Sequence, residues 1–425
     1  MNHVLWDEAI CKRLLRHKKQ TPRNYMELRI IMQNKKALTI IFFTVFIDLL
    51  GFGILIPILP TFASGEIGIS DFGIGVIIAV YSLTQFLFNP IIGRFSDRVG
   101  RRPVILVTLL ITSLSYIVFS FSTTFLILVL SRFLGGIGGS NIGAAQAYIA
   151  DITDKSNRAK GMGMIGAAFG LGFVFGPVMG GFLSEYGYEY VGFASAGFSV
   201  LAFLFALIFL PESLKEKKPM DNFSISLFKI DDFKSILKLP NVGIFIFLFF
   251  IIIFSVANIY GTFALLGQKY YGFTNRENGY LFGIIGIVST IIQGGLIKRF
   301  SAMWSEKTII IVGLVFLMFG LGLLPYGSNF TGVALISVVL AIGTGTLQPT
   351  LISLVSKYSP EDRQGAILGF NQSIAALARV LGPLWGGFAF QALGYEAPFV
   401  TGGIFAFVTI LMTIYLVKSK RLDIN

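Results

Sequence analysis

The stretch KALTIIFFTVFIDLLGFGILIP (residues 36–57) decides the fold, because it is apolar almost throughout and long enough to cross a membrane. A helix rises about 1.5 Å per residue, and a hydrocarbon core about 30 Å thick needs about 20 residues. One carboxylate interrupts the stretch: Asp48, twelve residues after Lys36 and twelve before Pro60. This spacing predicts that Asp48 lies near the middle of the bilayer. A charge there costs about 2.5–3.5 kcal/mol on insertion scales, so we expect a functional role for Asp48, and proton coupling is the first to test.

The composition extends this conclusion to the whole chain. Of its 425 residues, 54% are hydrophobic and 13% are charged, and the mean hydropathy is +0.77. Soluble domains carry about 25% charged residues, so we predict an all-α integral membrane protein and not a soluble enzyme. The only cysteine (Cys11) and the two histidines (His3 and His17) all lie near the N-terminus. The sequence therefore excludes an intramolecular disulfide and a buried histidine metal site.

Twelve apolar stretches predict twelve transmembrane spans. They lie near 38–61, 72–93, 103–121, 124–150, 160–184, 190–210, 241–267, 277–297, 307–325, 330–355, 364–392 and 397–417. With the N-terminus inside, 30 of the 34 Lys and Arg residues fall on cytoplasmic segments. This is the positive-inside pattern, so the net charge of +12 indicates topology and no nucleic-acid partner. Both termini are expected to be cytoplasmic, and the topology fits a bacterial inner membrane.

The spacing of the spans predicts a division into two bundles. The expected parts are an N-terminal arm (1–36), a six-helix bundle (37–210), a cytoplasmic linker (211–240), a second six-helix bundle (241–417) and a cytoplasmic tail (418–425). The arm holds nine Lys and Arg residues. It is interpreted either as a partly helical tail that contacts anionic headgroups or as a disordered extension.

Short segments recur at a nearly constant spacing along the chain. The sequence RFS occurs at 94–96 and again at 299–301, an offset of 205. At an offset of 206, GPVMGG (176–181) matches GPLWGG (382–387). These matches predict two parallel six-helix repeats, with a binding site near the membrane midplane between them.

The loop between the expected second and third spans has the sequence GRFSDRVGRRP (93–103). Two glycines permit a tight turn, and one acid among four arginines can form a charge cluster. A solvated, positively charged loop is the structural alternative. The pattern G-x-x-x-D-x-x-G-R-R resembles the signature loop of the major facilitator superfamily, which implies the major facilitator fold.

In that family this loop helps to lock the outward-facing state, together with an acid at the end of helix 4. The resemblance assigns this gating role to Gly93, Asp97, Gly100, Arg101, Arg102 and the helix 4 acid Asp151. In the second repeat Ala302 replaces the counterpart of the loop aspartate, so a latch is expected on one side only.

The fifth expected span contains GFVFGPVMGG (172–181). Small residues four apart form a smooth face for close helix packing, and a proline bends the helix. Ordinary packing is the structural alternative. The pattern G-x-x-x-G-P-x-x-G-G resembles the motif of proton-coupled drug antiporters in the superfamily, which implies export. The residues that carry it are Gly172, Gly176, Pro177, Gly180 and Gly181.

Arg132 lies within the fourth expected span, in RFLGGIGG (132–139). Counting residues from the outer end places it about 15 Å deep, which predicts the same level as Asp48. Intramembrane ions usually pair or line water, so we expect a switchable pair of Asp48 and Arg132, direct or through water. A permanent structural ion pair is the alternative. The pattern R-x-x-x-G-x-G resembles the helix 4 motif of antiporters, in which the arginine is implicated in proton transfer.

The first two spans resemble those of tetracycline-efflux-type transporters. FIDLLGFGILIPILP (46–60) is similar to their helix 1, and YSLTQFLFNP (81–90) to their helix 2, whose glutamine faces the substrate and corresponds to Gln85. Those transporters also carry a functional histidine in helix 8 and an aspartate in helix 9. The eighth and ninth spans here contain neither residue type, which argues against a tetracycline–metal chelate as substrate.

Polar side chains in the apolar spans are candidates for the substrate cavity. Arg379 lies sixteen residues beyond Arg363, and no acid lies deep within the spans of the second bundle, so we expect Arg379 to face the cavity as an anion-binding or Asp48-sensing group. Further candidates are Asn258, Gln348 and Asn371. Each can equally bond a neighbouring helix.

The sequence thus favours a monomeric, proton-coupled exporter of amphipathic or lipophilic small molecules. It needs no metal or other cofactor, with the proton as coupling ion, and its partners are the substrate and the bilayer. An alternative on the same fold is a facilitator, or an exporter of an anionic lipid, siderophore or metabolite. A non-transporting receptor is a third class, but no soluble sensor domain is evident, and no Walker A sequence occurs for ATP drive.

Overall fold

Helices make up the regular structure of the described residues, which are 22–153, 158–214, 235–237, 239, 241–360 and 363–418 of a computed structural model. Most of the predicted arm (1–21), most of the predicted linker and the tail beyond residue 418 lie outside these ranges. The predicted all-α class is confirmed. The twelve-span count is consistent with eleven helical segments that are long and apolar enough to cross a membrane and a slightly shorter twelfth, α15.

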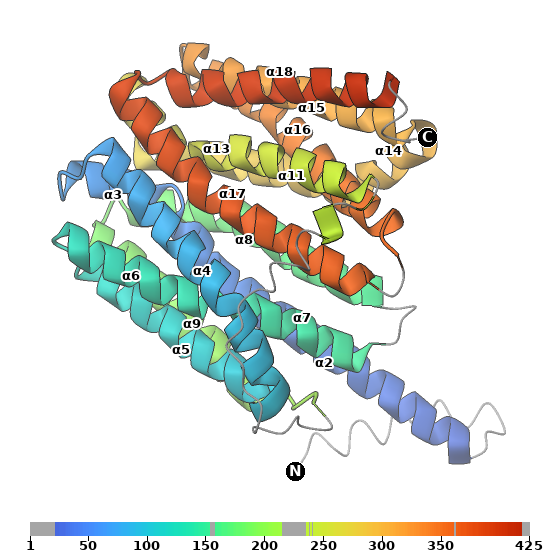
Figure 1. The fold of residues 1–425 in the computed structure, drawn as a ribbon. Coiled ribbons are helices and arrows are strands. Elements are labelled where there is room, and N and C mark those ends of the chain that lie inside the picture. The colour runs from blue at the N-terminus through green and yellow to red at the C-terminus, as the bar shows by residue number, and fades with distance from the viewer. Residues whose placement is uncertain are drawn as a thin grey trace.

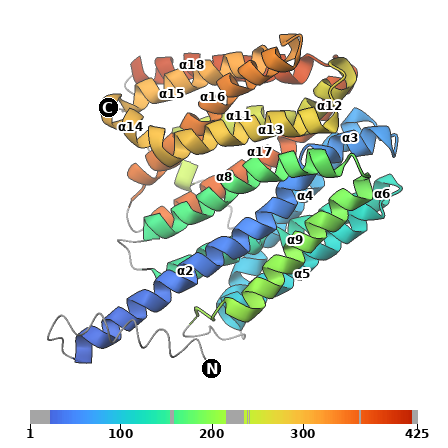
Figure 2. The same cartoon turned by 180° about the vertical axis from the view of Figure 1, so that it is seen from behind.

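The N-terminal helices run in chain order through the first six spans (Figures 1 and 2). They are α2 (Pro22–Leu55), α3 (Ile58–Gly65), α4 (Asp71–Val99), α5 (Arg101–Ser120), α6 (Phe125–Gly138), α7 (Asn141–Ile152), α8 (Arg158–Leu183) and α9 (Tyr188–Phe209). The first span is α2 continued by α3, and the fourth is α6 continued by α7. Side-chain caps begin several helices, as when Ser70 accepts a hydrogen bond from the Gly73 amide at the start of α4.

The C-terminal helices form the last six spans. They are α11 (Val242–Ala257), α12 (Ile259–Tyr270), α13 (Asn275–Ile291), the π-helix η1 (Ile292–Leu296), α14 (Ile297–Met303), α15 (Glu306–Gly322), the 3₁₀ turn η2 (Leu324–Tyr326), α16 (Phe330–Lys357), α17 (Gln364–Ala392) and α18 (Ala397–Lys418). In the seventh span α11 ends and α12 begins on either side of Asn258.

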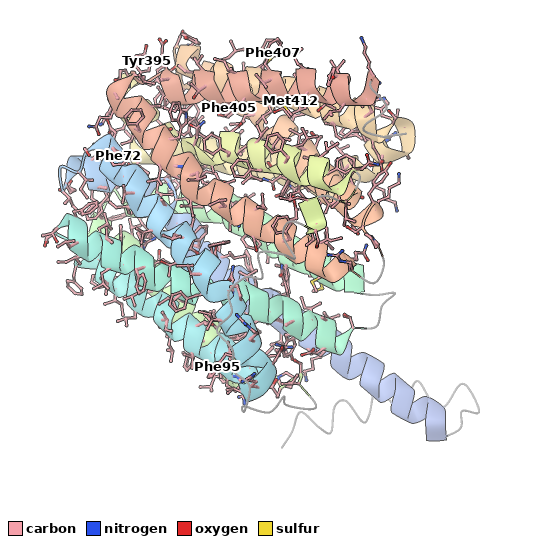
Figure 3. The ribbon with its side chains drawn as sticks, in the orientation of Figure 1. Phe72, Phe95, Tyr395, Phe405, Phe407 and Met412 are labelled. Carbon is pink, nitrogen blue, oxygen red and sulfur yellow. The ribbon has the colours of Figure 1, made fainter. Side chains whose placement is uncertain are left out.

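Two helix pairs join the N-terminal helices to the C-terminal helices. α4 lies along α17 (Figure 1), and α8 lies along α13 (Figure 2). Large apolar side chains project from the outside of the bundle, among them Phe95 and Phe407, which are 41% and 48% exposed (Figure 3). An apolar exterior of this kind is what a helical bundle presents to lipid.

The two sets of helices are held together at one end of the bundle, which we call the odd-loop end because it carries the loops after spans 1, 3, 5, 7, 9 and 11. Lys269 binds Asp71 at 2.5 Å, and Arg276 binds Glu185 at 3.4 Å. The Asn275 amide also donates to the Tyr188 hydroxyl at 3.0 Å.

The opposite end, which we call the even-loop end, carries the loops after spans 2, 4, 6, 8 and 10. Glycines of four spans there would have open space for a Cβ: Gly93, Gly163, Gly294 and Gly369. The ion pairs Lys269–Asp71 and Arg276–Glu185 join the two sets of helices at the odd-loop end, so the bundle is closed there.

Candidate functional site

Asp48 lies in α2 with 6% of its surface exposed. Its Oδ2 accepts a 2.7 Å hydrogen bond from Asn141 Nδ2, and its Oδ1 accepts a 2.9 Å bond from the Ser199 hydroxyl. The donors come from α7 and α9, so three spans meet at this carboxylate. Hydrogen bonds to an ionised acceptor are short and strong, which lets an unpaired carboxylate exist inside an apolar bundle.

The prediction that Asp48 and Arg132 share a level is wrong. Asp48 bonds to Asn141, which lies nine residues further along the fourth span than Arg132, or roughly 13 Å. The first span continues through α3 to Gly65, so Asp48 lies deeper below the odd-loop end than its distance from Pro60 suggested. In this conformation the two charges form no direct ion pair.

Arg132 instead lies closer to the odd-loop end and is 3% exposed. Its guanidinium donates to the Ser131 hydroxyl at 2.9 Å and stands 5.7 Å from the ring centre of Phe119. Its Nε is buried and has no hydrogen-bond partner in the ranges that the structure describes. A cation over an aromatic face is stabilised by the ring quadrupole, but this site leaves part of the charge unsatisfied.

Two tyrosines lie near both charged groups. The hydroxyls of Tyr81 in α4 and Tyr116 in α5 are within electrostatic reach of both Asp48 and Arg132. Tyr81 also stacks on Phe52 of α2, with ring centres 5.4 Å apart. Sequence reasoning missed both tyrosines, because an aromatic residue in a Phe-rich span gives no signal of its own.

Arg379 lies on α17, within electrostatic reach of Tyr81 and of Tyr260. Tyr81 belongs to the N-terminal helices, so this guanidinium lies where the two sets of helices face each other. Within the described part of the chain it has no ion pair. This position agrees with the expectation that Arg379 faces the space between the bundles.

The other cavity candidates differ in burial and in hydrogen bonding. Gln85 donates from Nε2 to the Gly139 carbonyl at 2.9 Å, and Gln348 is half-buried. Asn371 is 1% exposed, and both of its amide atoms lack a partner among the described residues. Asn258 is fully buried and donates to the Pro398 carbonyl at 2.9 Å, so it bonds a neighbouring helix, which is the alternative that the sequence left open.

The glycines of the antiporter motif pack α8 on two partners. Gly172, Gly176 and Gly180 contact the backbone of α2, where a Cβ would meet Leu49, Gly53 or Ile54. Gly181 instead contacts Arg276 of α13, across the interface between the two sets of helices. The motif therefore positions the helix of Asp48 and also closes the odd-loop end.

The second repeat uses its glycines in the same way. Gly386 lies against the Asn258 backbone as Gly180 lies against Ile54. Gly387 lies against Asp71 and Phe72 of α4, as Gly181 lies against Arg276. The 206-residue sequence match thus corresponds to equivalent packing.

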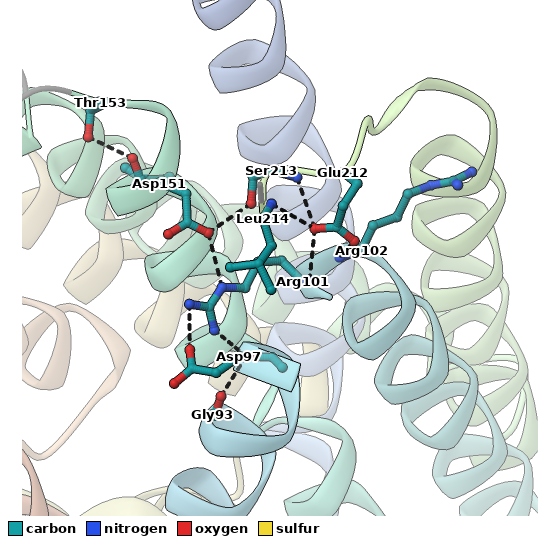
Figure 4. Close-up of polar contacts among 11 residues, drawn as sticks. Gly93, Asp97, Arg101, Arg102, Asp151, Thr153, Glu212, Ser213 and Leu214 are labelled. Atoms are coloured by element: carbon teal, nitrogen blue, oxygen red, sulfur yellow. Dashed lines mark hydrogen bonds and ion pairs between the residues drawn. The ribbon is translucent and has the colours of Figure 1, made fainter. Parts of the chain in front are cut away.

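The signature loop forms a charge cluster at the even-loop end, centred on Arg101 (Figure 4). Its guanidinium binds Asp97 at 2.6 Å, Asp151 at 3.1 Å and the Ser96 hydroxyl at 2.6 Å. Gly100 ends α4 with φ 124°, a conformation that favours glycine. The Arg102 guanidinium instead donates to the Leu207 carbonyl at 2.7 Å.

Two residues that sequence reasoning missed complete this cluster (Figure 4). The Glu212 carboxylate accepts from the backbone amides of Arg101 and Arg102, at 2.9 and 3.2 Å. The Ser213 hydroxyl donates to Asp151 at 3.0 Å. The available signal was the sequence Pro-Glu-Ser at 211–213, an acid directly after the sixth span.

Comparison with known proteins identifies the family of this chain. A profile of the Major Facilitator Superfamily matches residues 41–383, and a further match covers residues 302–423. The chain belongs to the Major Facilitator Superfamily. It is therefore a multi-pass membrane transporter and not an enzyme, as the sequence predicted.

Relatives in this superfamily include drug-resistance proteins. The chain is 31% identical to the class B tetracycline resistance protein of Escherichia coli, over 80% of this chain and 84% of that protein. It is 32% identical to multidrug resistance protein 1 of Bacillus subtilis (strain 168), over 89% of this chain and 95% of that protein. It also resembles the crystal structure of the human organic anion transporter MFSD10 (TETRAN), with a TM-score of 0.69, 25% identity and coverage of 89% and 99%.

Glu212 gives a first prediction for this superfamily member. The carboxylate accepts hydrogen bonds from two backbone N–H groups at the start of α5 that have no partner within the helix. Its negative charge is also attracted to the positive end of the helix dipole. We expect Glu212→Ala to lower the stability of the protein by about 1–2 kcal/mol. Thermal unfolding in detergent measures this, with Glu66→Ala as control, because Glu66 is an exposed acid that does not lie at the start of a helix. Equal unfolding midpoints for the two variants would contradict the capping role.

Proposed function

We propose that the protein is a proton-coupled exporter of amphipathic or lipophilic small molecules, working by alternating access. The observation that carries the proposal is Asp48, a membrane-buried carboxylate that two neutral donors hold and that has no cationic partner in the described part of the chain. Such a group can gain or lose a proton without breaking an ion pair. Resistance relatives that match most of the chain support export as the direction of transport.

The proposed cycle couples the charge of Asp48 to the two ends of the bundle. We place the odd-loop end outside the cell and both termini in the cytoplasm, because basic residues gather on the even-loop segments. A proton from outside neutralises Asp48 and lowers the cost of closing the bundle around it. Substrate enters from the cytoplasm, and release of the proton there restores the charge. The substrate binds through apolar contacts, with few polar groups to orient it.

The proposal also covers the oligomeric state, the membrane, the partners and the coupling ion. The transporter acts as a monomer in a bacterial inner membrane. Its partners are the substrate and the bilayer, not nucleic acid. The proton is the coupling ion, and no metal or organic cofactor takes part.

Proteoliposomes test the coupling in the unmodified protein. With an acidic lumen and inside-out protein, a fluorescent lipophilic substrate should accumulate in the lumen and leave when nigericin collapses the gradient. A compound panel identifies the substrate. Uptake at the same rate with and without the gradient would instead indicate a facilitator.

A second candidate function is the export of organic anions. Arg379 is a largely buried cation with no acidic partner in the described part of the chain. It lies near Tyr81, which belongs to the opposite set of helices. A carboxylate or sulfonate on the substrate would satisfy it with charge-assisted hydrogen bonds. The similar solved structure is named as that of an organic anion transporter, which adds support.

Arg379→Gln separates the two candidates. If Arg379 binds substrate anions, the variant should lose about 10- to 150-fold in affinity for an anionic amphiphile, since a hydrogen bond to a charged group contributes about 1.5–3 kcal/mol. Affinity for a neutral amphiphile of the same size should stay the same. Tryptophan-quenching titrations measure both, with Arg363→Gln as a control cation at the even-loop end. Equal effects on both compounds would contradict anion recognition.

A further inference from the structure

The fourth span is interrupted beside Asp48. α6 ends at Gly138 and α7 begins at Asn141. The side chain of Gln85 binds the Gly139 carbonyl at 2.9 Å, and the Tyr81 hydroxyl lies so near Gly139 that a Cβ there would clash. α4 therefore holds this break from one side. Asn141, the first residue of α7, connects its other side to Asp48.

Asn141 carries an unused hydrogen-bonding group. It is 4% exposed, and its Nδ2 donates to Asp48, while its Oδ1 is buried with no partner among the described residues. Leaving a buried polar atom unsatisfied is unfavourable, so an orphan acceptor beside a titratable acid calls for a physical reason. Ser199, the other donor, is a hydroxyl that can rotate between donating and accepting.

The amide of Asn141 suits both protonation states of its neighbour. An ionised Asp48 only accepts, and Asn141 donates its N–H to it, as the structure has it. A protonated Asp48 gains an O–H that needs an acceptor. The Oδ1 of Asn141 supplies that acceptor when the amide turns about its Cβ–Cγ bond, so the hydrogen bond persists with its direction reversed.

We propose that Asn141 senses the protonation state of Asp48 and transmits it to the break in the fourth span, and through Gln85 and Tyr81 to α4. The proposal rests on the proposed function, because it takes Asp48 to be the group that binds the coupling proton. It adds a positioning residue that acts through Asp48 and belongs to none of the recognised motifs.

α4 connects the break to the closed end of the bundle. It is one helix from Asp71 to Val99, and its first turn supplies Asp71 to the ion pair with Lys269. The Phe72 amide in the same turn donates to the Gln391 side chain of α17 at 3.1 Å. A shift at Gly139 therefore acts on the helix that helps to hold the odd-loop end shut.

Other ionisable groups around Asp48 do not explain a pH response near neutrality. Tyr81 and Tyr116 reach it from α4 and α5, and tyrosine is ordinarily neutral at that pH. Arg132 of α6 supplies a fixed positive charge, and α9 supplies the neutral Ser199.

The test is a pH-dependent distance across the odd-loop end. Spin labels are placed by Glu66→Cys and Leu393→Cys in a Cys11→Ser background, and distances are measured in liposomes from pH 5 to 9. Both labelled positions are exposed. The matched pair is Asn141→Thr and Asn141→Val, which have the same shape and differ by one hydroxyl that both donates and accepts.

We expect the Thr variant to keep at least half of the wild-type distance change and the Val variant to lose most of it. Ser199→Ala should keep the change but move its midpoint up by about one pH unit, the effect of one lost hydrogen bond to the carboxylate. Equal responses of the Thr and Val variants overturn the proposal.

Asp48→Asn distinguishes a failure of proton coupling through Asp48 from a failure of the role of Asn141. If its distances still respond to pH, proton coupling through Asp48 is itself wrong. If they do not respond, while Asn141→Val responds fully, the role of Asn141 alone is wrong.

Discussion

Asp48→Asn is expected to slow gradient-driven transport strongly while leaving substrate binding intact. Asparagine has nearly the same size and can still bond Asn141 and Ser199, but it cannot change its charge. The energetic difference between the charged and neutral states, about 2.5–3.5 kcal/mol for an acid inside a membrane, is then lost to the cycle. We expect the initial rate of gradient-driven uptake to fall by about 100-fold, the rate equivalent of about 2.7 kcal/mol.

Two measurements make this prediction specific. Exchange of labelled for unlabelled substrate without a pH gradient should continue at near the wild-type rate, because exchange needs no net proton movement. Glu189→Gln, which removes an exposed acid at the start of α9, should leave both rates unchanged. Gradient-driven uptake by Asp48→Asn at the wild-type rate would remove Asp48 from the coupling mechanism.

Asp48 also shows where reasoning from the sequence succeeds and where it stops. The cost of a charge in lipid depends only on local sequence, so burial of this carboxylate was predictable from residues 36–57. Its partners were not, because Asn141 and Ser199 lie 93 and 151 residues away in the chain. Both are small polar residues, and many such residues in transmembrane helices bond only their own backbone.

Arg132 illustrates a second limit. Its depth was counted from the ends of apolar stretches, and those ends do not mark the ends of helices. α3 extends the first span to Gly65, and this lowers Asp48 relative to Arg132. Periodicity and composition therefore predict the spans well, but they do not fix the relative level of two spans. Glu212 was missed for a related reason, since its partners are backbone amides that leave no pattern in the sequence.

Two adjacent glycines should separate folding from conformational switching. At Gly180 a Cβ would clash with the Ile54 backbone of α2, inside the N-terminal set of helices. At Gly181 a Cβ would lie 2.8 Å from the Arg276 Cα of α13, across the interface. The first contact is expected in every state of the transporter, and the second only while the odd-loop end is closed.

Gly180→Ala should therefore destabilise the fold by about 1–3 kcal/mol, as overpacking against a rigid neighbour does. Its thermal midpoint in detergent should fall, and Gly386→Ala, the equivalent change in the second repeat, should behave alike. Gly163→Ala is the control, because a Cβ there meets nothing within 4 Å. Alanine also favours helix more than glycine, so the control should be neutral or slightly more stable.

Gly181→Ala should instead keep its thermal midpoint and open the odd-loop end. A clash of about 2 kcal/mol confined to the closed state shifts the closed-to-open ratio roughly 30-fold, since 1.4 kcal/mol is a factor of ten. The spin-label distance between positions 66 and 393 should lengthen at every pH, and Gly387→Ala should reproduce this from the other repeat. A wild-type distance in both variants would mean that helix packing at these glycines does not set the conformational equilibrium. Because the same clash raises the energy of only one state, the direction of the distance change also identifies which end of the transporter these glycines close.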